Sequence, residues 1–384
     1  MKISDAIKSF LLLLILIISF SARSDANWIK AEQKMENTQS TPHTQNTQHS
    51  KSDSLPAGVT KEWLNSLLDE NGSSIIPEDP EGDAIQRSTF TGAAAGDHYG
   101  QSVSSAGDVN GDGFDDVIIG APNAAGYFGR AYIYYGGLNM NSIADVILSG
   151  EGAYDYYGAS VSGAGDVNGD GYSDVIVAAS DYGSFIGRAY IYYGGAVMND
   201  ISDVIMTGEA MNNRFGLSVS GAGDLNGDGY DDVIVGAWGY SSYTGRAYIY
   251  YGGVTMNNVI DITFTGEATF NHFGASVSGA GDVNGDGYSD VIVGAERYNS
   301  FTGRSYVYYG GAAMNNVADV IMTGEASISF GSTVSVAGDV NGDGYSDLII
   351  GAPWYNQDTG RAYIYYGGAL MNNVADFIIK GESA

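Results

Sequence analysis

From Ser88 onward, short runs of apolar residues alternate with turns rich in Gly, Asn and Asp, and the whole pattern occurs five times. The second copy holds four such runs, Ala159–Gly165, Asp174–Ala178, Arg188–Tyr193 and Asp203–Thr207. Its second and third runs are apolar on both alternating faces, which is typical of strands that are covered on both sides. The first run is almost entirely Ser, Gly, Ala and Val, and such small side chains suit a position where several sheets converge. The pattern predicts four short β-strands per copy, which we call A, B, C and D in chain order.

The spacing of the copies indicates the architecture. Four-stranded sheets of about 58 residues, covered on both faces and repeated, are typical of β-propeller blades. A β-solenoid is the alternative, although its coils usually need fewer residues. We therefore expect an all-β propeller of five repeats over residues 88–384. The segment Asp-Val-Asn-Gly-Asp-Gly, or its Leu variant, begins at Asp108, Asp166, Asp224, Asp282 and Asp339, in steps of 58, 58, 58 and 57 residues.

The first 87 residues are of a different kind. Residues 1–26 read as a signal peptide, because the apolar run from Phe10 to Phe20 has 11 residues, too few to span a bilayer comfortably. Uncleaved anchoring is the alternative. Residues 27–58 are polar and predict a disordered linker. Residues 59–87 predict a connector with one short helix, in which Trp63, Leu64, Leu67 and Leu68 share a face. The chain is therefore expected to be exported, to the extracellular space, the cell surface or the periplasm, with no transmembrane span once mature.

Charge and cysteine content exclude several classes of protein. The 16 Lys and Arg stand against 45 Asp and Glu, a formal net charge of −29, which excludes binding of nucleic acid through phosphate neutralisation. The absence of Cys excludes disulfides, thiolate metal sites and a cysteine nucleophile.

Each A–B loop carries the pattern Asp-x-Asn-x-Asp-Gly-x-x-Asp, which predicts a calcium site. Side chains at positions 1, 3 and 5 can converge because the Gly at position 6 permits a sharp turn, position 7 offers its carbonyl, and position 9 adds a third carboxylate. Hard oxygen ligands suit Ca²⁺ and not Zn²⁺. An Asx-rich turn would be the alternative for one isolated copy, but five copies in register favour about five structural Ca²⁺ sites. The expected ligands are Asp108, Asn110, Asp112, Phe114 and Asp116; Asp166, Asn168, Asp170, Tyr172 and Asp174; Asp224, Asn226, Asp228, Tyr230 and Asp232; Asp282, Asn284, Asp286, Tyr288 and Asp290; Asp339, Asn341, Asp343, Tyr345 and Asp347.

Two other repeated positions carry charge. Asp115 and Asp231 stand at position 8 of their loops and are expected to be solvated. An Arg begins every C strand, and we expect it to be structural, bridging backbone carbonyls or the repeated Asp of strand D. These arginines are Arg130, Arg188, Arg246, Arg304 and Arg361.

The stretch from Phe273 to Ala295 resembles an FG-GAP repeat, the repeat of the integrin α-subunit β-propeller and of many bacterial surface proteins. The first and last copies also keep Gly-Ala-Pro, at Gly120 and Gly351. The resemblance covers about residues 88–384. It implies calcium in the A–B loops and a role in adhesion or ligand binding. Integrin propellers have seven blades, whereas five complete repeats are present in this chain.

The number of outer strands exceeds what five blades need. A D-like strand, Ser88–Gly92, precedes the first repeat, and another, Asp376–Lys380, ends the fifth. A closed ring needs only one of them. We therefore expect a five-bladed ring with one spare strand, which could pack loosely or pair with another copy of the chain.

The B–C and D–A loops differ in every copy, and in an antiparallel meander they share one end of the blades. This face, opposite the calcium loops, is the candidate binding surface, because function concentrates in variable loops on a fixed scaffold. Aromatic side chains with Asn, Ser and Gly neighbours suit sugar rings or protein contacts, although half of them could instead be packing between blades. The candidates are Tyr127, Phe128, Tyr182, Phe185, Trp238, Tyr240, Tyr243, Tyr298, Phe301, Trp354 and Tyr355.

No catalytic constellation is recognisable, since the nucleophile-elbow, HExxH and P-loop patterns are absent. His98 and His272 lie in D–A loops and either could act as an acid or base, although an exposed loop histidine is ordinarily uncommitted. The leading hypothesis is noncatalytic binding of an extracellular glycan or protein. The alternatives are a structural or assembly module of a cell-surface complex, and a glycan-active hydrolase or lyase.

Overall fold

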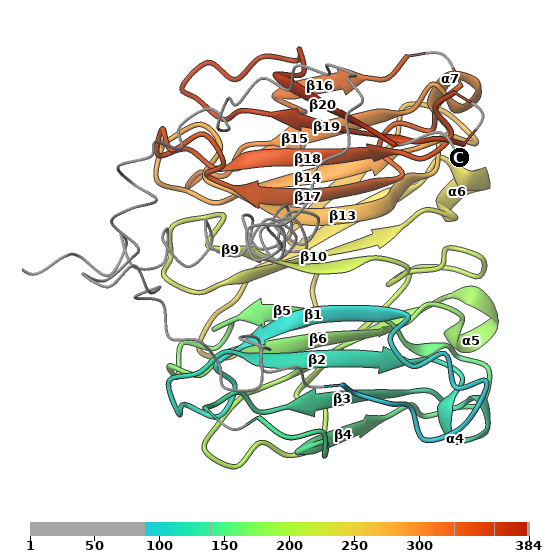
Figure 1. Cartoon of the computed structure of the whole chain (residues 1–384), viewed down its shortest axis with the longest axis vertical. Coiled ribbons are helices and arrows are strands. Elements are labelled where there is room, and N and C mark those ends of the chain that lie inside the picture. Colours follow the sequence, from blue (N-terminus) through green and yellow to red (C-terminus); the bar gives the residue numbers. More distant parts are fainter. Residues whose placement is uncertain (1–88, 139, 326, 357, 382–384) are drawn as a thin grey trace, which may run out of the picture. The chain divides into compact units, whose positions relative to one another are not determined.

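The computed structural model describes residues 89–381, apart from 139, 326 and 357. They form five four-stranded antiparallel sheets, and in each sheet the strands are neighbours in chain order. We call these sheets blades 1 to 5 (Figure 1). The expected all-β, five-bladed architecture is confirmed, whereas the predicted signal peptide, linker and connector lie outside the described residues. The strands are β1 Ser102–Gly107, β2 Asp116–Ala121, β3 Arg130–Tyr134 and β4 Val146–Ser149 in blade 1; β5 Tyr157–Gly165, β6 Asp174–Ala179, β7 Arg188–Tyr192 and β8 Val204–Thr207 in blade 2; β9 Val219–Gly223, β10 Asp232–Ala237, β11 Arg246–Tyr250 and β12 Ile262–Thr265 in blade 3; β13 Phe273–Gly281, β14 Asp290–Ala295, β15 Arg304–Tyr308 and β16 Val320–Thr323 in blade 4; β17 Thr333–Gly338, β18 Asp347–Ala352, β19 Arg361–Tyr365 and β20 Phe377–Lys380 in blade 5.

The strands predicted for the second repeat agree with β5 to β8 to within two residues at each end. All six residues of β6 are buried, as expected for a strand that is covered on both faces. Val175 pairs with Tyr192 and Val177 with Tyr190 across the β6–β7 ladder, so β-branched and aromatic side chains stand opposite each other. The central strands thus form because their residues fit a pleated surface that is buried on both sides.

The innermost strands of successive blades lie side by side, in the order β1, β5, β9, β13 and β17. These strands need small residues because the backbones of neighbouring innermost strands approach each other closely. A Cβ atom added to Gly221 would lie 2.8 Å from the carbonyl oxygen of Gly163, and one added to Gly279 would lie 2.7 Å from that of Gly221. Neither position has room for a side chain, which explains why strand A is almost free of large residues.

Each pair of neighbouring blades encloses its own apolar cluster. Between blades 2 and 3, Ile176 and Met206 pack against Phe215 and Tyr248, all four almost fully buried. The Phe215 and Tyr248 rings are 5.6 Å apart between centroids. Because blades 2, 3 and 4 each contribute to two such clusters, the fold is held together by blade boundaries in series.

The spare strand differs from expectation. Residues 89–92 form no strand, and the outer edge of blade 5 is occupied by β20, the second of the two predicted D-like segments. With no C strand left to pair with, residues 89–92 instead lie against blade 1, where the Phe90 ring centroid is 4.5 Å from that of Tyr134. Phe90 thus covers the outer part of blade 1, as the D strand of a preceding blade would.

The boundary between blade 5 and blade 1 is open among the described residues. Val340 of blade 5 is 51% exposed, although Val109 at the same repeat position is fully buried. Val103 of blade 1 is 62% exposed, although the equivalent Val161 is 5% exposed. The expected closure of the ring is therefore not present in the described part of the chain.

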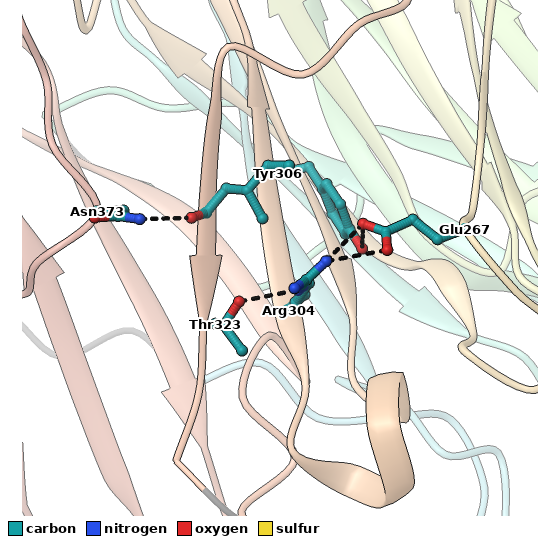
Figure 2. A network of polar contacts seen from close by, with 6 residues as sticks. Glu267, Arg304, Tyr306, Thr323 and Asn373 are labelled. Carbon is teal, nitrogen blue, oxygen red and sulfur yellow. Dashed lines mark hydrogen bonds and ion pairs between the residues drawn. The ribbon is translucent and has the colours of Figure 1, made fainter.

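The repeated arginines join neighbouring blades, as Figure 2 shows for Arg304. Arg304 at the start of β15 donates to both carboxylate oxygens of Glu267, at 2.7 and 3.0 Å, and its Nε donates to Thr323 Oγ1 at 2.9 Å. The Tyr306 hydroxyl donates to the same carboxylate, and the Arg304 guanidinium lies 3.8 Å from the centroid of the Tyr298 ring. Glu267 follows β12, so this contact connects blade 3 to blade 4.

The expectation that these arginines are structural therefore has a concrete basis, but the expected partner was wrong. The strand D carboxylate is already engaged, because Asp319 Oδ2 accepts a hydrogen bond from the backbone N–H of Tyr309 at 2.8 Å. The arginine pairs instead with the Glu that follows strand D of the preceding blade. The pairs are Arg188 with Glu151, Arg246 with Glu209, Arg304 with Glu267 and Arg361 with Glu325.

Replacing Arg246 by Ala should lower the free energy of unfolding by about 1–2 kcal/mol, because the change removes an ion pair and a cation–π contact. The ion pair joins Arg246 to Glu209 at 2.8 Å, and the guanidinium lies 3.6 Å from the Tyr240 ring centroid. Urea unfolding followed by tryptophan fluorescence measures the loss.

Arg130→Ala is the matched control, because Ala93 and Ala124 stand where the other blades have Glu and Tyr. The Nε atom of Arg130 has no hydrogen-bond partner among the described residues. This substitution should cost less than about 0.5 kcal/mol. Equal losses for the two variants would contradict the assigned role of the Glu and Tyr partners.

Candidate metal loops and ligand-binding face

The A–B loops share one hydrogen-bonded geometry, which blade 2 illustrates. Asp166 Oδ1 accepts from the backbone N–H groups of Gly169 and Asp170 at 2.7 and 3.0 Å, and its Oδ2 accepts from Gly171 at 2.8 Å. Gly169 and Gly171 have φ values of +75° and +90°, which favour glycine. The first Asp of the motif therefore stands at the centre of a loop that curls around its carboxylate.

The other side chains of the loop also accept backbone hydrogen bonds. Asn168 Oδ1 accepts from the N–H of Asp170 at 2.8 Å, and Asp170 Oδ1 accepts from the N–H of Tyr172 at 3.0 Å. Each carboxylate or amide oxygen has two lone pairs, so one hydrogen bond leaves it able to bind a cation. Positions 1, 3 and 5 thus present hard oxygen donors within one loop, the donor type that Ca²⁺ prefers.

The ninth residue has a structural task that the motif alone did not reveal. Asp174 is fully buried, and its two oxygens accept from the backbone N–H groups of Val167 and Gly194 at 2.9 and 2.8 Å. It therefore ties the A–B loop to the C–D turn. The Tyr-Gly-Gly segment, which recurs in step with the motif, was the signal of this contact in the sequence. The equivalent residues Asp116, Asp232, Asp290 and Asp347 make the same two bonds.

The buried carboxyl group lies in an unfavourable electrostatic environment. The pKa of Asp174 is raised to about 7, chiefly by burial and in smaller part by repulsion from Asp170 and Asp166, while the two backbone hydrogen bonds lower it. The pKa values of Asp232 and Asp290 are raised to about 7 for the same reasons. A bound cation would relieve this repulsion, so the donor set and its electrostatics fit Ca²⁺.

The carboxylates are not, however, gathered as a closed metal site. Among the described residues, no group of three or more His, Asp or Glu side chains has a metal-holding arrangement. The ninth carboxylate is turned toward Val167 and Gly194 instead, and its place among the metal ligands stays a prediction.

The aspartates at position 8 differ from each other. Asp115 is exposed, but Asp231 is partly buried and its Oδ2 accepts from the backbone N–H of Asp166 at 2.8 Å. The expectation that Asp231 is solvated was therefore wrong. Asp231 belongs to blade 3 and Asp166 to blade 2, so this residue connects the metal loops of two blades. Asp115 has no preceding blade among the described residues to bond with.

The variable B–C and D–A loops lie at the opposite end of the blades from the metal loops. The B–C loops contain the four-residue turns α4 Ala124–Tyr127, α5 Tyr182–Phe185, α6 Tyr240–Tyr243 and α7 Tyr298–Phe301, which gather at one end of the blades in Figure 1. Ser241, Ser242 and Tyr243 have φ values of 45°, 57° and 64°. Non-glycine residues in this region are strained by roughly 1–2 kcal/mol each, and such strain is often concentrated at functional sites.

The structure divides the aromatic candidates of this face into two groups. The exposed group projects into solvent, with exposures of 38–47%: Tyr127, Phe128, Phe185, Tyr243 and Trp354. The second group packs against other side chains. The Trp238 ring lies 4.1 Å from the His272 ring, and the Phe301 ring lies 5.0 Å from the Trp354 ring, both between centroids. Four tyrosines lie beneath the repeated arginines and serve the blade boundaries: Tyr182, Tyr240, Tyr298 and Tyr355.

Two exposed aromatics of the D–A loops were missed in the sequence. Tyr154 is 65% exposed and stacks at 5.0 Å on Tyr127, and Phe270 is 60% exposed and stacks at 5.8 Å on Tyr243. In each pair a D–A loop meets a B–C loop. The variability of these loops was visible, but the pairing of the two loops could only be seen in three dimensions.

The two histidines of this face have different environments. His272 is 3% exposed, and its Nδ1 lies 3.3 Å from Glu296 Oε1, with the Trp238 ring packed against it. The expectation of an exposed loop histidine was therefore wrong for His272. Hydrogen bonding to His272 lowers the pKa of Glu296. His98 is exposed, with Nδ1 3.2 Å from Asn123 Nδ2.

Two equivalent cavities open between the D–A and B–C loops. A cavity of about 600 Å³ in blade 3 is lined by Asn213 and Tyr243, and one of about 340 Å³ in blade 4 by Asn271 and Phe301. Asn213 and Asn271 occupy the same repeat position, are 4% and 6% exposed, and have an Nδ2 atom without a partner among the described residues. A buried donor without an acceptor is costly, and a ligand oxygen could satisfy either amide nitrogen once the loops that shield it from solvent move.

Parts of the chain match known repeat families and curated proteins. The FG-GAP repeat model matches residues 99–134, 273–308 and 330–365, and the FG-GAP-like repeat model matches residues 166–235. The chain is 31% identical to integrin alpha-5 of Xenopus laevis over 189 residues, which is 45% of this chain and 18% of the relative. It is 35% identical to integrin alpha-V of Gallus gallus over 179 residues, 44% of this chain and 17% of the relative.

A relative of another kind is phosphatidylinositol-glycan-specific phospholipase D of Bos taurus, 33% identical over 198 residues, 44% of this chain and 23% of the relative. The matched stretches thus span less than a quarter of these relatives. In the described part of the chain, no helix has both the length and the apolar character needed to cross a membrane.

Proposed function

Because the chain is an FG-GAP repeat protein that resembles the integrin α subunits, we propose that it is an exported, calcium-stabilised propeller that binds an extracellular glycan or protein without catalysis. The residues proposed to hold calcium are those of the five A–B loops. Calcium would neutralise the carboxylates of each loop and stabilise the hairpin from which the loop projects.

The proposed binding surface is the face formed by the B–C and D–A loops. The observation that carries this proposal is the pair of cavities in blades 3 and 4, where exposed aromatic rings stand beside a buried amide with an unpaired N–H group. An aromatic wall with a few polar groups suits a sugar ring or a protein side chain with an oxygen acceptor. Aromatic contacts of this kind commonly supply most of the energy of binding.

Catalysis receives no support from His272, one of the two histidines of this face. His272 is almost fully buried between Trp238 and Glu296, so it is not placed to exchange a proton with a ligand in solvent. The phospholipase relative is matched over only 23% of its length. Noncatalytic binding therefore remains the better account of this surface.

The proposed function is tested by measuring the affinity of the chain, in calcium-containing buffer, for each member of a panel of glycans and matrix proteins. Tyr243→Ala and Trp354→Ala should each weaken binding of a positive ligand by about 10-fold or more, since each removes an exposed aromatic contact. Ile143→Ala, a 75% exposed residue remote from the variable loops, should leave the affinity unchanged. Binding that withstands both aromatic substitutions would contradict the assignment of this face.

A further inference from the structure

Two arginines of the face formed by the B–C and D–A loops, which we call the variable face, lie outside the repeated set. Arg214 belongs to a D–A loop and Arg297 to a B–C loop, and these loops contain no other Lys or Arg. Elsewhere in the described chain the positive side chains are the repeated arginines and Lys380 of β20. In a chain of net charge −29, a cation that is not neutralised inside the molecule would attract an anionic ligand to its own site.

The two arginines differ in how far they are neutralised. Arg214 Nη1 donates to Asp181 Oδ1 at 2.9 Å, in a well-formed ion pair. The Arg297 side chain is 43% exposed, and its one ion pair among the described residues joins Nε to Glu296 Oε1 at 3.9 Å, which is beyond hydrogen-bonding distance. The same Glu296 oxygen lies 3.3 Å from His272 Nδ1. The Arg297 guanidinium, with its five N–H donors, is therefore available to a ligand.

Arg297 immediately precedes α7 and lines the cavity of about 340 Å³ in blade 4. Its guanidinium lies 5.1 Å from the centroid of the Phe301 ring, and Phe270, which is 60% exposed, belongs to the same lining. The volume is near the lower end of the range for small-molecule sites, roughly 300–1,000 Å³, so it suits one small ring. The rest of the described lining contains amide and hydroxyl groups but no carboxylate: Thr269, Asn271, Asn299 and Ser300.

The equivalent cavity of blade 3 shows that the positive charge is particular to blade 4. Gly239 occupies the repeat position of Arg297, and the described lining of the blade 3 cavity has no charged side chain. A Cβ atom on Gly239 would lie 2.0 Å from the carbonyl oxygen of Asn212, so no side chain fits there. Tyr243 lines the blade 3 cavity, Phe270 lines that of blade 4, and their rings stack at 5.8 Å between centroids. The variable face thus offers a neutral site next to a positively charged one.

We propose that the blade 4 cavity binds a sugar residue that carries a carboxylate, and that Arg297 binds the carboxylate. This inference rests on the proposed function, because it names the ligand class of the same binding face. The planar guanidinium matches a carboxylate and can donate two parallel hydrogen bonds to it. The Phe270 and Phe301 rings suit the apolar face of a sugar ring, and the amide and hydroxyl groups of the lining suit its hydroxyls.

An acidic peptide would use less of this cavity than a sugar acid. A carboxylate side chain of a peptide could bond the Arg297 guanidinium, but it has no hydroxyls for Asn299 and Ser300 and no ring face for the aromatic wall. The Asn271 amide nitrogen is shielded from solvent, so it becomes a further donor only when the loops move. The charge of Arg297 should therefore set the preference for an acidic over a neutral sugar, while the aromatic and polar groups bind both.

Ligand-observed NMR titration of the chain in calcium-containing buffer tests the proposal with two probes of the same ring, methyl β-D-glucuronide and methyl β-D-glucoside. The wild type should bind the glucuronide more tightly than the glucoside by about 10-fold or more, the effect of one charge-assisted pair. Arg297→Gln should abolish this preference and leave the affinity for the glucoside unchanged. Arg297→Lys, which keeps the charge but not the planar fork, should keep a smaller preference.

Arg214→Gln is the matched control, because it removes the same charge from the same face. Asp181 already engages the Arg214 guanidinium, so this variant should prefer the glucuronide as strongly as the wild type does. Unfolding midpoints equal to that of the wild type would show that the variants are folded.

Equal affinities of the wild type for the two glycosides would overturn the proposal, as would a preference that Arg297→Gln retains or that Arg214→Gln also loses. A capped aspartate that binds as tightly as the glucuronide, with the same dependence on Arg297, would make the cavity a site for acidic peptides instead. A glucuronide that fails to bind, while the glycan and matrix-protein panel yields a ligand sensitive to Tyr243→Ala and Trp354→Ala, would overturn this inference alone. Failure of both the glucuronide and the panel would remove the proposed function as well.

Discussion

Chelation of calcium is expected to lower the free energy of unfolding of this chain by roughly 13 kcal/mol, if all five loops bind and free calcium is 100 times each dissociation constant. Each site that binds only the folded state then contributes about 2.7 kcal/mol. The physical reason is the carboxylate repulsion within each loop, which for blade 2 joins Asp166, Asp170 and Asp174. Urea unfolding in calcium and in chelator gives the difference directly, and calorimetric titration gives the number of sites.

Substitutions in one loop separate ligation from general screening of the negative charge. Asp112→Asn keeps the size of the side chain and its bond to the N–H of Phe114 but removes one proposed ligand charge. It should lose about 2.7 kcal/mol of calcium-dependent stability, the contribution of one site. Asp115→Asn changes the net charge equally at the exposed position 8 and should lose almost none. Superimposable unfolding curves in calcium and chelator would contradict the metal assignment altogether.

The sequence was sufficient for the blades because the same physical demand recurs five times. Strands such as β6 need apolar residues on both faces, strand A needs small residues where backbones approach, and the loop turns need glycine at positive φ. Each demand fixes residue types at fixed spacing, so the repeat shows them without knowledge of the neighbours. The strand bounds and the separation of variable from constant loops followed from this regularity.

Contacts between blades could not be predicted in the same way. The repeat shows that Arg304 or Asp231 recurs, but not which side chain of the neighbouring blade it meets. Arg304 pairs with Glu267, and Asp231 accepts a hydrogen bond from the N–H of Asp166. Both contacts join two blades and are visible only in the folded structure. The burial of His272 beneath Trp238 likewise depends on loops from different parts of the chain. Val103 and Val340 are exceptions to the pattern, because no blade covers them among the described residues.

Asp232 allows the structural and metal-binding roles of the ninth residue to be separated. Its carboxylate oxygens accept from the backbone N–H groups of Leu225 and Gly252, each at 2.8 Å, in a fully buried position. Asp232→Ala would leave two buried donors without an acceptor, and each costs about 1–3 kcal/mol. We therefore expect this variant to lose up to about 2–6 kcal/mol of unfolding free energy even in chelator. Burial raises the pKa of Asp232 to about 7, so its ionised form is costly in the folded chain, and the loss should be smaller at pH 8 than at pH 5.

Asp228→Ala is the matched control from the same loop. The Asp228 side chain is exposed and accepts from the N–H of Tyr230 at 3.1 Å, so in chelator its loss should cost less than about 1 kcal/mol. In calcium this variant should lose in addition about 2.7 kcal/mol, the contribution of one site, as Asp232→Ala should if the ninth carboxylate also ligates. A harmless Asp232→Ala in chelator would show that its backbone bonds do not support the blade. A calcium-dependent loss for Asp228→Ala alone would instead restrict Asp232 to the structural role, because its two oxygens are already engaged by the backbone.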